Sequence, residues 1–312
     1  MTTETTQPNA YTTQDYSGPK ARWCPGCGGH SILSIVKKVL VTEQLKPEQT
    51  VFVSGIGCSS RFPHYLKTYG FHSLHGRPLP VACGVKSRRP DLDVWVATGD
   101  GDCCAIGAGH WVHAIRYNMN MVVMLFDNSI YGLTKMQTSP TTPKHSFSNT
   151  HPTGALLSPL NPLMVTLSIT NASFVAQTLD WQPQHLYDTL LAAHRHPGLS
   201  FVRIIQRCTH FKTNELDSFH EDADTIQLLE HETLGLVPDE KMKAKYPHLI
   251  NHDPSNLAKA FALASDSRYT PAGILYRNLG AERYDDLTAQ GLGKSPREKI
   301  AATEKIFSSY LI

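Results

Sequence analysis

The stretch Asp93-Val94-Trp95-Val96-Ala97-Thr98-Gly99-Asp100-Gly101-Asp102 decides the fold class of this chain. Its first part is mostly apolar and β-branched, which is typical of a buried strand. The glycines at 99 and 101 then let the backbone turn sharply and approach another molecule closely. Ligands of open α/β sheets bind beyond the carboxyl ends of the strands. The stretch therefore predicts a strand that runs directly into a ligand-binding loop.

Other apolar runs of similar length occur on both sides of this stretch, at residues 51–53, 121–126 and 200–205. Apolar residues at helical spacing separate the runs, over residues 31–45, 60–69, 105–117 and 183–194. Alternating helices and fully apolar strands predict an α/β fold with a mostly parallel sheet and helices on both faces. The loops after these strands should then meet at one edge of the sheet.

The two ends of the chain differ from this pattern. Residues 1–20 are rich in Thr, Gln and Asn, and we expect a flexible N-terminal arm there. Residues 21–210 contain the predicted α/β domain. No comparable apolar strands follow, so residues 211–312 are expected to form a C-terminal extension of helices and loops.

The composition excludes several classes of protein. Of 312 residues, 41% are hydrophobic and 18% are charged, which is typical of a folded globular chain. Lys and Arg (29) nearly balance Asp and Glu (27), and no basic cluster suits a phosphate backbone, so nucleic acid is not an expected partner. The longest apolar run is far below the ~18 residues that span a bilayer, and no signal sequence is visible. A cytoplasmic protein without membrane association is expected.

Two of the predicted loops offer oxygen ligands for a metal ion. Asn128 follows Asp100 by 28 residues, which fits one strand–helix–strand step back to the same edge. Carboxylate and amide oxygens suit Mg²⁺, which commonly binds few protein oxygens together with phosphates. The carbonyl of Ile130 is the natural third ligand, so we predict a Mg²⁺ site for a diphosphate. A nicotinamide site is disfavoured because Cys104 stands where its loop needs a third glycine.

The cysteines fall into two groups. Cys24 and Cys27 form a chelating Cys-x-x-Cys pair, while Cys58 and Cys208 each follow a predicted strand at the ligand-binding edge. Four such thiolates suit an iron–sulfur cluster or a zinc ion, because spacing alone does not identify the metal. The other three are expected to be small buried hydrophobic residues, namely Cys83, Cys103 and Cys104.

Taken together, the motifs resemble one family. Gly-Asp-Gly at 99–101 followed by Asn128 is the thiamine diphosphate motif. The elements as a set resemble the β subunits of the 2-oxoacid:ferredoxin oxidoreductases, in the order Trp23-Cys24-Pro25-Gly26-Cys27-Gly28, Gly55-Ile56-Gly57-Cys58-Ser59-Ser60, Leu74-His75-Gly76-Arg77, Gly99-Asp100-Gly101-Asp102 and Asn128-Ser129-Ile130-Tyr131-Gly132. Residues 271–274 and 283–286 are similar to tails of the 2-oxoglutarate branch.

The resemblance implies a thiamine-diphosphate-binding fold and a thiamine-dependent oxidoreductase. Such an enzyme decarboxylates a 2-oxoacid, here preferentially 2-oxoglutarate, transfers the acyl group to coenzyme A and reduces ferredoxin through a [4Fe–4S] cluster. The cluster ligands implied are Cys24, Cys27, Cys58 and Cys208. An α subunit would supply the catalytic glutamate in an α2β2 assembly. Pyruvate or a broader set of 2-oxoacids is the alternative substrate, and a zinc-stabilised non-redox thiamine enzyme or binding module is the alternative function.

The resemblance also implies roles for residues around the cofactor. The residues expected to contact it are Ile56, Gly57, Cys58, Ser59, His75, Arg77, Gly101, Asp102, Gly132 and Leu133. His75 is also expected to be catalytic near the thiazolium, with a structural hydrogen bond as the alternative for both His75 and Arg77. Arg61 stands where the family has a basic residue, and it is predicted to clamp the substrate's C1 carboxylate through two parallel hydrogen bonds. A surface position on the helix is the alternative for Arg61.

Overall fold

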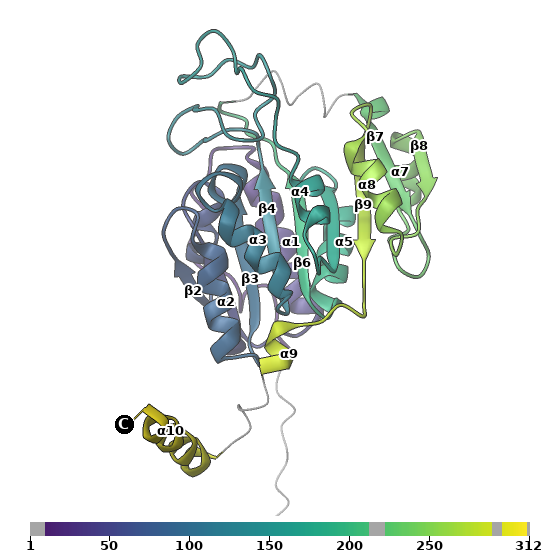
Figure 1. Cartoon of the computed structure of the whole chain (residues 1–312). Helices are drawn as coiled ribbons and strands as arrows, with labels where there is room; N and C mark the ends of the chain where they lie inside the picture. The colour runs from purple at the N-terminus through teal and green to yellow at the C-terminus, as the bar shows by residue number, and fades with distance from the viewer. Residues whose placement is uncertain (1–9, 212–221, 289–294, 311–312) are drawn as a thin grey trace, which may run out of the picture.

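The computed structural model describes residues 10–211, 222–288 and 295–310, and a nine-stranded sheet forms its centre (Figure 1). The strands lie in the order β2-β1-β3-β4-β6-β5-β9-β7-β8. All neighbours pair in parallel except β5 and β9, which are antiparallel. The strands are β1 Thr50–Ser54, β2 Tyr69–His72, β3 Asp93–Gly99, β4 Met121–Asp127, β5 Phe174–Leu179, β6 Leu199–Ile205, β7 Ile226–Glu230, β8 His248–Asn251 and β9 Thr270–Arg277.

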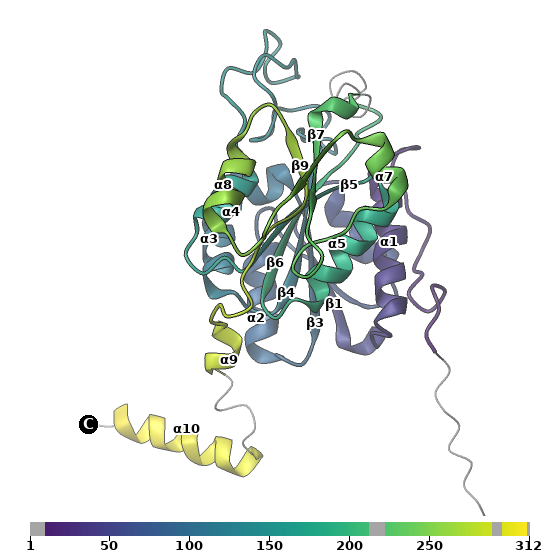
Figure 2. The same ribbon diagram turned by 90° about the vertical axis from the view of Figure 1, so that its right-hand side faces the viewer.

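Helices cover both faces of the sheet, as Figure 2 shows. One face carries α1 (Gly28–Thr42) and α5 (Pro183–Arg195), and the other carries α2 (Pro78–Arg88), α3 (Ala108–Tyr117), α4 (Pro162–Ser168) and α8 (Leu257–Ser265). The shorter helices are α7 (Glu240–Lys245) and α9 (Tyr284–Thr288). The last helix, α10 (Pro296–Tyr310), lies apart from the sheet in both views.

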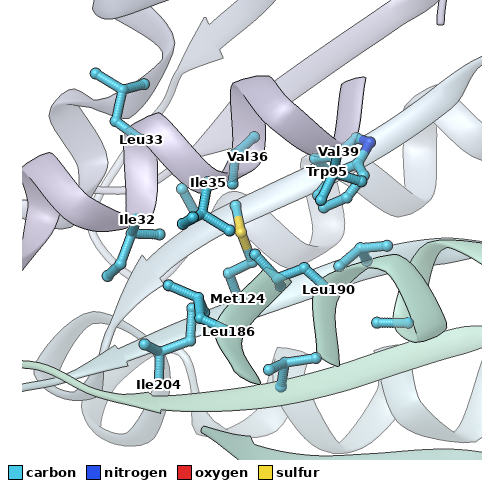
Figure 3. Close-up of a cluster of buried hydrophobic side chains, with 14 of the residues drawn as sticks. Ile32, Leu33, Ile35, Val36, Val39, Trp95, Met124, Leu186, Leu190 and Ile204 are labelled. Atoms are coloured by element: carbon cyan, nitrogen blue, oxygen red, sulfur yellow. The ribbon is translucent and has the colours of Figure 1, made fainter. Parts of the chain in front are cut away.

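The core between the sheet, α1 and α5 follows from helical spacing in the sequence (Figure 3). Ile32 and Val36 of α1 lie one turn apart and are fully buried against the sheet, as is Leu186 of α5. Successive strand residues point to opposite faces, so Trp95 joins this core while Val96 joins the one beneath α2 and α3. Burial on both faces explains why these strands are apolar throughout.

The predicted fold class is confirmed, and all four predicted strands form. Their neighbouring positions in the order β1-β3-β4-β6 bring the four predicted loops to one edge. The helix predicted over residues 60–69 is wrong. Residues Ser59–Tyr65 form a 3₁₀ turn instead, with Pro63 inside it, and the edge strand β2 begins at Tyr69. Proline lacks the N–H that an α-helix needs, so the chain turns and extends there.

The C-terminal part differs from the expected helices and loops. Strand β9 pairs with β5 and continues the sheet, and β7 and β8 follow it at the edge. Strands β7 and β8 are short and β8 is partly exposed, so neither has a long continuous apolar run. Strand β9 is longer, but it contains Pro271 and Gly273, which are uncommon in strands. The pairing of these strands depends on β5, a strand that also escaped the sequence prediction.

The predicted N-terminal arm is ordered where the structure describes it. The Tyr16 side chain is fully buried, and its hydroxyl lies 2.6 Å from the Leu45 carbonyl oxygen. Ser17 also pairs with Leu66 in an antiparallel bridge. Residues 10–20 therefore pack on the domain, while residues 1–9 lie outside the described residues. No helix among the described residues is long and apolar enough to cross a membrane.

Two buried histidines should make the folded protein less stable in mild acid than at neutral pH. Burial lowers the pKa of His185 and of His196 to about 4. An unfolded histidine titrates near pH 6.5, so protonation favours the unfolded chain as the pH falls through 6.5 toward 4. We expect the free energy of unfolding to fall by about 2 kcal/mol per histidine between about pH 7 and about pH 5. Urea titrations at both pH values measure this fall in the free energy of unfolding. If the His185→Gln protein lost as much stability between the two pH values as the wild type, the prediction for His185 would be contradicted.

Candidate active site

A pocket opens at the edge of the sheet where β1, β3 and β4 end. Nine of the ten residues predicted at the cofactor line it: Ile56, Gly57, Cys58, Ser59, His75, Gly101, Asp102, Gly132 and Leu133. The predicted Mg²⁺ ligands line it too, namely Asp100, Asn128 and Ile130. Loops more than 70 residues apart in the sequence are thus gathered around one cavity, because their strands are parallel neighbours.

Two glycines shape this pocket in different ways. Gly57 has φ +125°, a left-handed conformation that favours glycine, and a Cβ atom there would meet nothing within 4 Å. By contrast, a Cβ atom on Gly101 would lie 2.1 Å from the Tyr131 ring, whose hydroxyl donates a hydrogen bond to the Gly101 carbonyl. Gly57 therefore borders free space, and Gly101 is needed for the close packing of Tyr131.

Asp100 is a buried carboxylate that no cation of the described chain neutralises. Its side chain accepts a hydrogen bond of 2.8 Å from the Thr141 hydroxyl. Burial, together with the nearby charge of Asp127, raises the pKa of Asp100 to about 7. A buried charge without a partner is unfavourable, and a bound cation would restore the ionised form. Asp100 thus fits a Mg²⁺ ion, as does the buried amide of Asn128 in the same pocket.

A second carboxylate shares the Thr141 hydroxyl. Asp127 also lies 2.8 Å from this hydroxyl, but Arg203 neutralises Asp127 through an ion pair of 2.6 Å. Since one hydroxyl carries one hydrogen, it cannot donate to both carboxylates at once. The arrangement leaves Asp100 as the carboxylate that needs a cation. Neither Thr141 nor Arg203 was predicted, because nothing in the local sequence links them to the motif.

Asp102 connects three loops around the pocket. Its Oδ1 atom accepts hydrogen bonds from the backbone of Ile56 (3.1 Å) and Gly76 (2.7 Å) and lies 2.8 Å from His75 Nδ1. Its Oδ2 atom accepts a bond of 2.7 Å from the Thr98 hydroxyl. The carboxylate is therefore occupied in holding the pocket walls, and it orients the predicted catalytic His75.

Asp102→Asn is expected to loosen these walls. An amide has one acceptor oxygen, so either Thr98 or the donors at Oδ1 lose their partner. We expect the free energy of unfolding to fall by about 2 kcal/mol and cofactor affinity to weaken without being lost. Chemical denaturation and calorimetric titration with thiamine diphosphate and Mg²⁺ measure the two effects. Unchanged stability would show that the four bonds are dispensable.

The two arginines predicted at the site lie outside the lining of the pocket. Arg77 Nη1 donates hydrogen bonds to the carbonyls of Gly76 and Ile106, which matches the structural alternative for this residue. Arg61 lies in the 3₁₀ turn after Cys58, with its guanidinium 5.9 Å from the centre of the Tyr65 ring. Neither contact reaches the cavity.

The four predicted cluster cysteines gather beside the pocket. The pKa of the Cys27 thiol is raised to about 12, first by burial and then by the nearby Cys58, Cys208 and Cys24. Burial and its cysteine neighbours also raise the pKa of Cys58 to about 11. A Cβ atom on Gly132 would lie 3.6 Å from the Cys58 sulfur and 3.9 Å from the Cys208 sulfur. Cys103 and Cys104 are buried, as expected, and Cys83 is partly buried.

Unpredicted residues hold the cysteine segments together. The buried Asp180 accepts hydrogen bonds from the backbone N–H and from the side chain of Arg207, next to Cys208. The Arg207 carbonyl in turn accepts a bond from the Gly28 N–H, next to Cys27. On the other side of Cys208, the Thr209 hydroxyl donates to the Pro25 carbonyl at 2.8 Å. Asp180 follows β5, a strand that the sequence pattern did not predict, so its role could not be predicted either.

Comparison with known proteins places this geometry in a family. The family profile described as thiamine pyrophosphate enzyme, C-terminal TPP binding domain, matches residues 55–204. The chain is 38% identical to 2-oxoglutarate oxidoreductase subunit KorB of Mycobacterium tuberculosis, over 86% of this chain and 78% of that protein. It is 35% identical to the β subunit of 2-oxoacid:ferredoxin oxidoreductase 2 of Aeropyrum pernix, over 85% and 82% of the two chains. The chain belongs to the 2-oxoacid:ferredoxin oxidoreductase β subunits.

The fold of this β subunit agrees with a solved member of the family. A 2-oxoglutarate:ferredoxin oxidoreductase from Magnetococcus marinus, with 2-oxoglutarate, coenzyme A and succinyl-CoA bound, matches it with a TM-score of 0.79. The sequences are 34% identical, and the match covers 95% of this chain and 96% of that chain. The predicted family, fold class and enzyme class are therefore confirmed, whereas the residue roles remain predictions.

Proposed function

We propose that this β subunit, together with an α subunit, catalyses the oxidative decarboxylation of 2-oxoglutarate with coenzyme A and reduces ferredoxin. In this proposal Asp100, Asn128 and the Ile130 carbonyl hold Mg²⁺ and the diphosphate of thiamine diphosphate. A [4Fe–4S] cluster is held by Cys24, Cys27, Cys58 and Cys208. The names of two relatives and of the solved structure favour 2-oxoglutarate over pyruvate.

The position of Gly132 carries the proposal. A Cβ atom there would lie within 4 Å of the sulfurs of Cys58 and Cys208 and also of the Asn128 amide. The predicted cluster ligands and a predicted Mg²⁺ ligand therefore border the same small space. A non-redox thiamine enzyme has no need of this arrangement, whereas an enzyme that oxidises its cofactor needs a cluster next to it.

Thiamine diphosphate, when bound, supplies the nucleophilic carbon and the electron sink of the reaction. The residues of the chain bind and orient the cofactor and accept or donate protons beside it. Since Asp102 accepts the hydrogen bond from Nδ1 of His75, the neutral ring keeps Nε2 as a proton acceptor on a side chain that lines the pocket. No glutamate is among the described residues that line the pocket, which supports an α subunit that supplies this carboxylate.

Zinc is the alternative metal for the four cysteines. Cys58 follows Cys27 by 31 residues and Cys208 follows Cys58 by 150, whereas a zinc ribbon typically has two close pairs of cysteines. Only Cys24 and Cys27 form such a pair in this chain. This spacing favours an iron–sulfur cluster over zinc in the proposal.

Metal analysis of the full chain tests the proposal. The protein is purified without oxygen, and its iron, acid-labile sulfide and zinc are measured. We expect a brown protein with iron and sulfide whose colour bleaches with 2-oxoglutarate once the α subunit is present. Robust turnover by the β subunit alone would contradict the need for an α subunit. A colourless protein that contains zinc or no metal would refute the cluster.

Arg61 belongs to this proposal as the clamp for the substrate's C1 carboxylate. The side chain would leave the Tyr65 ring and reach the pocket mouth in the complete enzyme. We expect Arg61→Ala to raise KM for every accepted 2-oxoacid by about 10- to 100-fold, because a charged hydrogen bond is lost. Arg61→Lys keeps the charge without the paired geometry and should show a smaller rise. Unchanged kinetics would assign Arg61 to the surface of the 3₁₀ turn.

A further inference from the structure

Gln206 follows β6 and lies between the pocket and the cysteines. It is 2% exposed, and its backbone N–H donates a hydrogen bond of 2.9 Å to the Asp127 carbonyl. Gln206 is one of the residues that line the pocket. Its Nε2 atom donates a hydrogen bond to the Cys27 sulfur at 3.6 Å. One buried residue thus borders the predicted cofactor pocket and contacts a predicted cluster ligand.

Packing holds this amide in place. A Cβ atom on Gly28 would lie 2.8 Å from Gln206 Cγ, so the glycine beside Cys27 lets the glutamine approach the sulfur. Cys27 also immediately precedes α1 and is the N-cap residue of that helix. Cys24, in contrast, is exposed to solvent. Cys27 is therefore a partly buried predicted ligand whose sulfur accepts a hydrogen bond from a side-chain donor.

We propose that Gln206 sets the reduction potential of the cluster through its hydrogen bond to Cys27. This inference rests on the proposed [4Fe–4S] cluster. An electron that enters the cluster increases the negative charge on its sulfurs, and an N–H donor stabilises that charge. The bond therefore raises the potential, which makes the cluster a better acceptor. Gln206 acts here as a positioning residue, since it works through the Cys27 sulfur.

Redox titration of the full chain, followed by electron paramagnetic resonance, tests the inference. Gln206→Leu removes the donor without adding charge, and its midpoint potential is expected to shift to a more negative value while iron content is kept. Gln206→Glu places a carboxylate beside the sulfur and should shift the potential further in the same direction. Gln182→Leu is the matched control, because its amide donates to the Tyr246 hydroxyl instead of a cysteine. An unchanged potential in Gln206→Leu with a full cluster overturns the inference.

If the Gln206 variants fail to assemble a cluster, a measurement on the unaltered protein still tests the inference. In protein labelled with ¹⁵N on the glutamine side chains, electron-nuclear double resonance should detect a glutamine nitrogen coupled to the reduced cluster. Absence of that coupling from an intact cluster also overturns the inference. A wild-type protein without iron refutes the proposed function itself, so the two failures are distinct.

Discussion

Asp100→Ala is expected to abolish Mg²⁺-dependent binding of thiamine diphosphate. Substitution of residues behind a metal ligand typically costs 10- to 100-fold in affinity, so loss of the one carboxylate among the predicted Mg²⁺ ligands should cost about 100-fold or more. Calorimetric titration with thiamine diphosphate, with and without Mg²⁺, measures the effect. Asp100→Asn is the matched variant, because it keeps the size of the side chain and a partner for Thr141 but removes the charge.

Without bound cofactor, removal of the Asp100 charge should not lower the stability of the protein. Burial and Asp127 raise the pKa of Asp100 to about 7, so its ionised form is unfavourable when no cation is bound. We expect the unliganded Asp100→Asn protein to be at least as stable as wild type, while added cofactor no longer stabilises it. Cofactor binding that survives both substitutions would contradict the proposed Mg²⁺ site. Lower stability of the unliganded Asn variant would instead assign Asp100 a structural role.

Cys208→Ser is expected to remove the iron–sulfur cluster. The segment around Cys208 is fastened to the Cys24–Cys27 loop through Arg207 and Thr209, so its sulfur is held where the other three cysteines meet. Loss of one thiolate opens an edge of the cluster to water and oxygen. Iron and acid-labile sulfide per chain, measured after purification without oxygen, should fall to a small fraction of the wild-type values.

Cys104→Ser is the control for this experiment. Cys104 is buried, whereas Cys208 is partly buried. Cys104 lies in the short π-helix after β3 (Asp102–Ile106), and it is not among the cysteines that raise the pKa of Cys27, which are Cys24, Cys58 and Cys208. The Cys104→Ser protein should therefore contain as much iron and acid-labile sulfide as the wild type. If Cys104→Ser lost iron while Cys208→Ser kept it, the fourth ligand would be assigned wrongly.

The predicted Mg²⁺ site and the predicted cluster site both border Gly132, so the Asp100 and Cys208 variants are each measured for both cofactor binding and iron content. We expect each substitution to affect mainly the site to which its residue is assigned. Asp100 contacts Thr141 and not the cysteines, so Asp100→Asn is expected to keep its iron. Cys208→Ser should likewise retain Mg²⁺-dependent cofactor binding, though with altered affinity.

The sequence by itself determined the family, the fold class and most of the pocket. Apolar strands such as β3 and β4 are recognisable because burial on both faces requires apolar residues at every position. Parallel strands end at one edge, so the order of strands and loops along the chain was enough to place Asp100, Asn128 and Cys58 together. Short motifs with fixed spacing carry this information because each stays within one strand and the loop after it.

Only the tertiary structure decided which partners these residues have. Thr141 reaches Asp100 across 41 residues and Arg203 reaches Asp127 across 76, and no local pattern marks either pair. The same holds for β9, which becomes a strand by pairing with β5, and for Tyr16, which anchors the N-terminal segment beneath α1. Such contacts depend on how distant segments pack, because a hydrogen bond needs two groups in contact, and contact between distant residues is a property of the folded chain.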